Sequence, residues 1–292
     1  MCARALVQAN PFFIDQVRAM EAAAQSIAGV PPLRYIYPGV GDQGLRPVDK
    51  RRARNLKLPI ERILTDLHVG TGGAVAQARA LFAADPFFKQ GVANLETNAM
   101  THDLGRALAE AADLLEFFTA EVETTNRIWA RTASFCSASA AQFDRADQGL
   151  SFFNQNASWL QPPGHVHAMI SETWAEQTLR TEAGREVNGT DAPSYSIAAQ
   201  RSLDNQLVIR AVNAGNHSRS VELTMQGGAV NGGPTRMLVL HGDSAGMDNT
   251  LGSPFNVAPV AGPGPRWGSG GKMLRLSLPR LSFMVVVSDL VE

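Results

Sequence analysis

Two side chains that can do chemistry stand at the ends of successive apolar runs. Glu96 ends the run Val92–Glu96, directly before a long helical pattern, and His68 ends a similar run one strand–helix unit earlier. A carboxylate can attack an electrophilic carbon or move a proton, and an imidazole can hydrogen-bond a carboxylate or a hydroxyl. Each residue also has a structural alternative, since a glutamate can cap the following helix and a histidine can simply complete a hydrogen bond. The elements that carry these residues therefore matter for their role.

Helix and strand patterns alternate through the first part of the chain. This order favours a parallel sheet with right-handed crossovers. No glycine-rich phosphate fingerprint accompanies the turns, so a barrel is favoured over a nucleotide-binding fold. The strands are expected at 33–37, 60–68, 91–96 and 127–136, and the helices at 13–27, 74–83, 101–118 and 163–174.

The number of these strands predicts only part of a barrel. A closed barrel of this kind needs eight strand–helix units in about 250 residues, and the pattern supplies half as many strands. We therefore expect residues 1–177 to form half of a (β/α)8 barrel of the TIM type. Thr101 is the expected N-cap of the helix at 101–118.

Short alternating runs replace the helical period after Gln177. Glycine- and proline-rich turns separate them, which is typical of an antiparallel β-sandwich, here expected over residues 178–292. The fold class is thus α/β plus all-β. The connection at 242–271 is long for a compact domain and fits either a surface loop or a segment packed on the neighbouring domain. The strands are expected at 195–199, 207–212, 221–225, 236–240, 273–278 and 282–287.

A barrel fold would place the side chains of Glu96 and His68 close together. Functional residues of parallel barrels lie at the carboxyl ends of the strands, and neighbouring strands would present Glu96 and His68 on the same face. Trp159 follows the last strand of the half-barrel. Its indole could serve as a stacking platform for a sugar, and a packing role is an equal alternative.

Composition and spacing argue against several classes of protein. The formal net charge of −1 and the pI of about 6.6 give no overall field for nucleic acid or an anionic membrane. No apolar run is long enough for a transmembrane helix, and the start has no signal-peptide pattern. Cys2 and Cys136 imply neither a disulfide framework nor a zinc site, and His165 with His167 lacks a third ligand, so no metal is expected.

The order of the motifs resembles the C-terminal portion of the α-L-arabinofuranosidases of glycoside hydrolase family 51. That resemblance implies a (β/α)8 barrel with a jelly-roll-like β-sandwich, and hydrolysis of terminal arabinofuranosyl groups with retention of configuration. It also implies an arabinose-containing oligo- or polysaccharide as the partner and no cofactor. The motifs are Leu33–Gly39, Asp66–His68, Val92–Glu96, Arg106–Ala111 and Trp159–Ile170.

The resemblance also assigns roles to single residues. Glu96 matches the family's nucleophile near the end of the seventh strand, and His68 matches the histidine that ends the sixth. The family's acid/base glutamate follows an asparagine at the end of the fourth strand, but no Asn-Glu pair occurs in the 292 residues. A retaining glycosidase needs both carboxyl groups.

Two explanations remain for the missing acid/base residue. The chain is either the C-terminal piece of a longer enzyme, which we favour, or a short protein that has lost catalysis and serves as a carbohydrate-binding or interaction protein. A longer protein would be secreted or endomembrane if it carried a signal peptide. Half a barrel also exposes two strand edges, which predicts self-association of the isolated chain.

Overall fold

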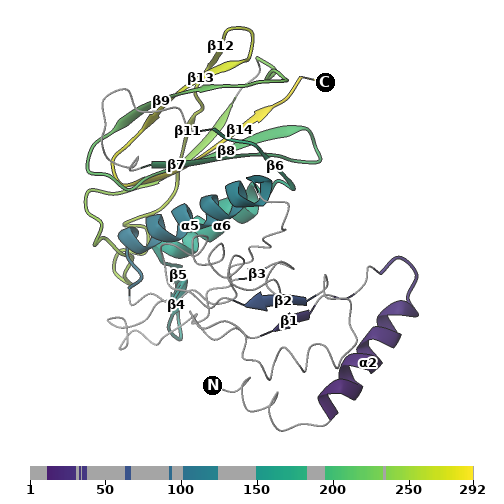
Figure 1. The fold of residues 1–292 in the computed structure, drawn as a ribbon. Coiled ribbons are helices and arrows are strands. Elements are labelled where there is room, and N and C mark those ends of the chain that lie inside the picture. Colours follow the sequence, from purple (N-terminus) through teal and green to yellow (C-terminus); the bar gives the residue numbers. More distant parts are fainter. Residues whose placement is uncertain are drawn as a thin grey trace, which may run out of the picture. The chain divides into compact units, whose positions relative to one another are not determined.

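The computed structural model describes residues 12–30, 33, 35–37, 63–66, 92–93, 101–123, 149–182, 195–232 and 235–291 (Figure 1). The described elements fall into two compact units, one with α2 and β1 to β3 and the other with everything from α5 onwards. None of the helices in these ranges is long and apolar enough to cross a membrane.

The first unit contains three short parallel strands in the order β1-β2-β3. These are β1 (Tyr35–Tyr37), β2 (Ile63–Asp66) and β3 (Val92–Ala93), and helix α2 (Phe12–Gln25) precedes them. Each strand falls inside a range predicted from the sequence, and their parallel pairing is confirmed. The strand predicted at 127–136 and the helix predicted at 74–83 lie outside the described residues, so the half-barrel remains a prediction.

The second unit is built on two antiparallel sheets. One sheet has six strands in the order β11-β10-β14-β8-β7-β6, and the other has the order β12-β13-β9. Every strand predicted for this part of the chain is found. The bounds are β6 (Gln177–Leu179), β7 (Tyr195–Arg201), β8 (Gln206–Asn213), β9 (Arg219–Thr224), β10 (Arg236–His241), β11 (Val260–Pro263), β12 (Trp267–Gly268), β13 (Met273–Leu278) and β14 (Ser282–Asp289).

The middle of this unit is buried on both faces of the six-stranded sheet. Strands β8 and β14 are nearly continuous apolar runs. One face of these strands packs on the sheet β12-β13-β9, and the other packs on helices. Strand β13 alternates between buried and exposed residues, since only one of its faces is covered. Helices α5 (Leu104–Glu123) and α6 (Pro162–Glu172) supply the third layer (Figure 1).

Helix α5 packs on the sandwich through apolar residues that recur at helical spacing in its sequence and form one stripe. The buried residues of the stripe are Leu104, Leu108, Ala111, Leu115 and Phe118, and they share one core cluster with β8 and β14. Both α5 and α6 therefore belong to the same compact unit as the two sheets, although they precede residue 177. The division of the chain into domains 1–177 and 178–292 remains a prediction.

The N-cap prediction for α5 was wrong by two residues. The carboxylate of Asp103, instead of the hydroxyl of Thr101, accepts a hydrogen bond from the backbone N–H of Arg106 at 2.8 Å. The hydroxyl of Thr101 lies 3.5 Å from the same carboxylate. The helix accordingly starts at Leu104, directly after its cap.

Candidate functional site

The two predicted catalytic residues follow neighbouring parallel strands. Strand β2 ends two residues before His68, and β3 ends three residues before Glu96. Because β2 and β3 are paired in parallel, their carboxyl ends share one edge of the sheet. His68 and Glu96 themselves lie outside the described residues, so their roles stay predictions.

Trp159 lies in a described two-stranded hairpin and is almost fully buried. Strand β5 (Ser158–Leu160) carries it and pairs with β4 (Ser151–Phe153). Its indole N–H donates to the carbonyl of Asn249 at 3.1 Å, and its ring meets Phe152 edge to face, with 6.1 Å between centroids. Only 7% of the residue is exposed. This position fits the packing alternative, and the sugar-stacking role stays a prediction.

Asn249 is the centre of a buried hydrogen-bond network that sequence reasoning missed. Its backbone N–H donates to the side-chain oxygen of Gln161 at 3.1 Å, and the Gln161 amide returns a bond to the Asn249 carbonyl at 2.6 Å. The Asn249 side-chain amide donates to the carbonyls of Leu160 and Val257, and its oxygen accepts the N–H of Val257 at 2.7 Å. The polar groups of this side chain are thus satisfied without solvent.

The segment around Asn249, residues 243–257, also holds the start of α5. The backbone N–H of Leu104 donates to Met247 O at 2.8 Å, and that of Gly105 donates to Ala245 O at 2.7 Å. These bonds satisfy donors that the first turn of a helix leaves free. The long connection at 242–271 thus packs against α5 and β5 for part of its length, which its sequence left undecided.

The 243–257 segment therefore contacts two elements that carry or closely follow predicted site residues. Helix α5 follows Glu96 in the chain, and β5 carries Trp159. The contacts of Asn249 with Trp159 and Gln161 join residues that lie 88 to 90 positions apart, and those with the start of α5 join residues still farther apart, so no local pattern predicts them. The one available signal was the unusual length of the connection.

Ionisable side chains are buried between α5 and α6. Arg106 Nη2 lies 2.9 Å from Glu110 Oε1, and His167 Nε2 lies 3.9 Å from Glu110 Oε2. Burial lowers the pKa of His165. The described residues offer no hydrogen-bond partner to Glu110 Oε2 or to Nε2 of either histidine. Within the same ranges, no cluster of three or more His, Cys, Asp or Glu residues could hold a metal ion.

Arg210 ties the central strand β8 to the helices. It is fully buried, and it donates to the side-chain oxygen of Gln200 and to the backbone carbonyl of Thr173 at the end of α6. Its guanidinium lies 5.6 Å from the ring centroid of Phe118 on α5, within range of a cation–π contact. Burial lowers the pKa of Arg210 to about 10, so a cation at neutral pH sits in the core between helices and sheet.

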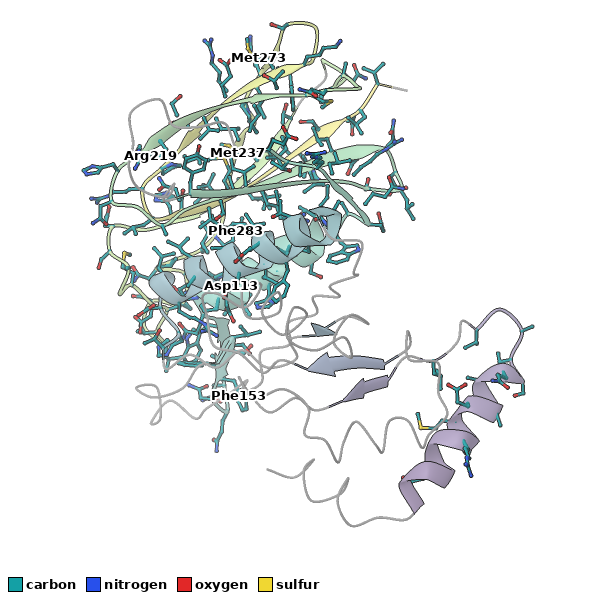
Figure 2. The ribbon with its side chains drawn as sticks, in the orientation of Figure 1. Asp113, Phe153, Arg219, Met237, Met273 and Phe283 are labelled. Carbon is teal, nitrogen blue, oxygen red and sulfur yellow. The ribbon has the colours of Figure 1, made fainter. Side chains whose placement is uncertain are left out.

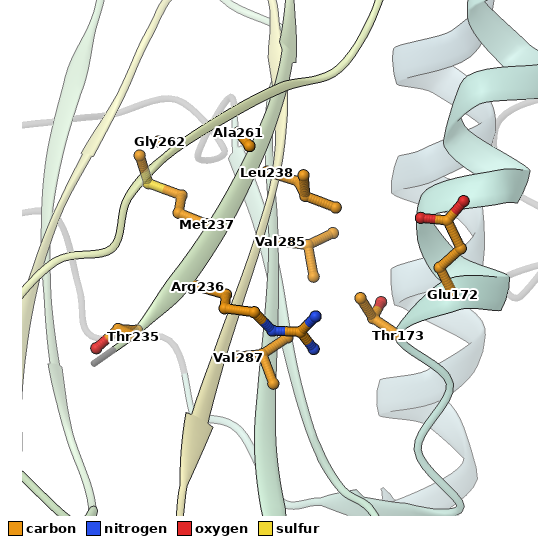
Figure 3. A pocket seen from close by; sticks show the side chains of 10 residues that line it. All are labelled: Glu172, Thr173, Thr235, Arg236, Met237, Leu238, Ala261, Gly262, Val285 and Val287. Atoms are coloured by element: carbon orange, nitrogen blue, oxygen red, sulfur yellow. The ribbon is translucent and has the colours of Figure 1, made fainter. Parts of the chain in front are cut away.

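A cavity of about 360 Å³ lies between the C-terminal end of α6 and strands β10, β11 and β14 (Figure 3). Its wall is largely apolar, and one arginine and one glutamate are the charged residues that line it. The lining residues are Glu172, Thr173, Thr235, Arg236, Met237, Leu238, Ala261, Gly262, Val285 and Val287. Figure 2 labels Met237, one of these lining residues, among the side chains of the strands.

Comparison with solved structures finds family 51 arabinofuranosidases. The α-L-arabinofuranosidase from Thermotoga maritima, solved as an arabinose complex, is 15% identical with a TM-score of 0.64, and the match covers 94% of this chain and 61% of that chain. The thermostable enzyme from Thermotoga petrophila RKU-1 is 16% identical with a TM-score of 0.64, covering 96% and 62% of the two chains. The chain therefore spans about three fifths of the length of these enzymes.

A xylanase of another glycoside hydrolase family has a similar fold. The family 30 endoxylanase from Clostridium papyrosolvens C71 is 16% identical with a TM-score of 0.51, and the match covers 94% of this chain and 59% of that chain. No protein-family model matches the sequence, and no curated protein matches it. The solved structures described above are glycoside hydrolases, and at these identities the likeness establishes the fold: this chain is folded like part of a family 51 arabinofuranosidase.

Proposed function

We propose that this chain is part of a retaining α-L-arabinofuranosidase that releases terminal arabinofuranosyl groups from arabinose-containing polysaccharides. The observation that carries the proposal is the fold likeness to family 51 enzymes over 94% to 96% of the chain. The parallel pairing of β2 with β3, the strands that lead to His68 and Glu96, supports it. In this proposal Glu96 attacks the anomeric carbon, and His68 orients the carboxylate or the substrate.

The chemistry requires a second carboxyl group. In a retaining glycosidase the acid/base group protonates the leaving oxygen, the nucleophile forms a glycosyl ester, and water then hydrolyses that ester with the acid/base group acting as a base. The two carboxyl groups stand about 5 to 5.5 Å apart. Since the 292 residues contain no Asn-Glu pair, the proposal takes the acid/base glutamate from the remainder of a longer enzyme.

Trp159 is proposed to help wall the sugar pocket. Its indole N–H is held by the Asn249 carbonyl, so the ring keeps one orientation. A fixed aromatic ring at the edge of a sugar site costs little conformational entropy when a ligand binds. No metal or organic cofactor enters the mechanism.

The test is the substitution Glu96→Ala in the complete enzyme, assayed on an aryl α-L-arabinofuranoside. Turnover should fall by at least about 10⁴-fold, because no covalent intermediate can form. Azide should restore part of the activity by attacking the anomeric carbon directly, with release of the aryl alcohol and formation of a glycosyl azide of inverted configuration. Glu222→Ala, at an exposed ion pair with Arg275 on the sandwich, is the matched control and should keep full activity.

The same assay distinguishes arabinofuranosidase activity from endoxylanase activity. Xylan is included because an endoxylanase shares the fold. Release of arabinose from arabinan without cleavage of the xylan backbone is expected. Cleavage of xylan alone would overturn the proposed substrate. Full activity of the Glu96→Ala variant would overturn the proposed nucleophile.

A second candidate function is a non-catalytic carbohydrate-binding or interaction protein. The absence of an Asn-Glu pair from the 292 residues favours it. In this case the natural protein would bind arabinan or arabinoxylan without releasing product, and the binding would survive Glu96→Ala. Turnover by the natural protein would rule this candidate out.

A further inference from the structure

The cavity at the end of α6 presents two opposite charges above an apolar wall. Arg236 comes from the first position of β10, and Glu172 is the last residue of α6. In Figure 3 the guanidinium of Arg236 extends from β10 toward Thr173. Neither charged side chain takes part in an ion pair within the described part of the chain. Both remain available to a ligand.

This pair of charges restricts the class of ligand. A simple anion would meet the carboxylate of Glu172, and a simple cation would meet the guanidinium of Arg236; each would place like charges together. A neutral polyhydroxylated molecule avoids both penalties, because each hydroxyl can accept from the guanidinium and donate to the carboxylate. The charges therefore favour a sugar over a singly charged ion.

The wall and the size of the cavity suit the same ligand. The side chains of Leu238, Val285 and Val287 lie on the face of the sheet that packs toward the helices, and they form an apolar surface that can cover the C–H face of a sugar ring. A volume of about 360 Å³ lies in the range of small-molecule pockets.

One polar wall of the cavity is held in place from behind. The hydroxyl of Thr173 donates to Met169 O at 2.6 Å, and the buried Arg210 donates to the carbonyl and the hydroxyl of the same residue. Thr173 therefore cannot rotate freely, and the end of α6 keeps its position relative to the sheet. A wall that is fixed before binding reduces the entropy that a ligand must pay to order it.

We propose that this cavity is an accessory binding site for a neutral pentose or a short pentose oligosaccharide. It is formed by α6 and the six-stranded sheet, and none of its lining residues belongs to the predicted catalytic set. The choice of a pentose rests on the proposed function; the preference for a neutral polyol rests on the charges. Arg236 supplies the donors, Glu172 the acceptor, and the valine and leucine side chains the apolar contact.

Arg236 also has a purely structural alternative. A cation near the C-terminal end of a helix interacts favourably with the helix dipole, and Arg236 points toward the end of α6. In that case its removal would lower stability without changing any ligand affinity. The test must therefore measure binding at the cavity and not stability alone.

The experiment is a titration of the full chain with L-arabinose and with arabinotriose, followed by NMR of the methyl groups of Leu238, Val285 and Val287 and by calorimetry. We expect saturable shifts of these methyls. Arg236→Met, which keeps an apolar stem, should weaken binding about tenfold, and Glu172→Gln should weaken it severalfold. Arg275→Met, which removes an exposed arginine from β13, is the matched control and should change the affinity less than about twofold.

Three results would overturn the site. The first is no shift of the three methyls, the second is equal affinity of Arg236→Met and Arg275→Met, and the third is binding of leucine, an apolar zwitterion, in place of the sugars. A further titration, with the Glu96→Ala variant, keeps the test of this site separate from the test of the proposed function. Glu96→Ala should leave the methyl titration unchanged, so loss of turnover and loss of cavity binding are read independently.

Discussion

Asn249 is a buried residue on which several of the described long-range hydrogen bonds converge. It is 1% exposed and bonds to Trp159, Leu160 and Gln161 in one part of the chain and to Val257 in another. Its removal would leave several buried donors and acceptors without partners, and each unpaired group costs about 1 to 3 kcal/mol. A polar residue inside a glycine-rich connection thus contributes to stability as an apolar core residue does.

Asn249→Ala is expected to lower the free energy of unfolding by about 2 to 4 kcal/mol in urea titrations. Asn256→Ala is the control, because Asn256 lies in the same segment, is exposed and donates one side-chain bond to Asp248 O at 2.9 Å. The control should lose less than about 1 kcal/mol. Equal losses for the two variants would mean that the buried network adds nothing beyond a surface contact.

His165 predicts how stability varies with pH. Burial lowers its pKa below the usual value of 6.5, so the unfolded chain binds a proton at a higher pH than the folded one does. Stability should therefore be full above about pH 6.5 and should fall as the pH drops from there through the lowered pKa. His165→Gln should flatten this part of the curve of unfolding free energy against pH, while the exposed His217→Gln should not. A curve unchanged by His165→Gln would show that His165 does not cause this pH dependence.

At the scale of elements, the sequence predicted strands and helices well but not their partners. Strands β7 to β10, β13 and β14 lie where short apolar or alternating runs predicted them. The pattern of apolar and polar residues in each run reflects whether one face or both faces of the strand are buried. Strands β11 and β12 are short and lie in a glycine- and proline-rich connection, so no run identified them. The apolar stripe of α5 predicted a buried face, but a stripe does not say which sheet covers it.

The cap of α5 offers a direct test of an element boundary. Asp103→Ala should destabilise the chain by about 1 kcal/mol, because the N–H of Arg106 loses its acceptor. Thr101→Ala should cost no more than a few tenths of a kcal/mol, since its hydroxyl caps no described helix N–H. Thermal unfolding of the two variants shows which residue caps the helix. A larger loss of stability for Thr101→Ala than for Asp103→Ala would support Thr101 as the N-cap, as predicted from the sequence.

At the scale of the molecule, the candidate site is predicted less completely than the fold. Its nucleophile and histidine come from pattern and resemblance, and the described backbone adds the parallel pairing of the strands before them. The Asn249 network and the cavity at α6 arise from contacts between residues distant in sequence. Such contacts depend on how the layers pack, which no run of residues encodes.

The isolated chain is expected to self-associate. Within the described residues, β1 and β3 are the edges of the three-stranded parallel sheet, and an unpaired edge is a template for another strand. Light scattering over a range of protein concentrations should show a mass above the 31.3 kDa of one chain. A strictly monomeric protein at all concentrations would argue that both edges are covered.

Trapping a covalent bond between Glu96 and the sugar decides whether Glu96 is the nucleophile. The complete enzyme is incubated with an activated 2-deoxy-2-fluoro arabinofuranoside, which slows hydrolysis of the glycosyl ester, and is then digested with trypsin. The peptide at 90–106 contains Glu96 and Asp103 as its carboxylates, and mass spectrometric fragmentation separates them. We expect the sugar on Glu96; a sugar on another carboxylate, or rapid turnover with no labelled peptide at all, would show that Glu96 is not the nucleophile.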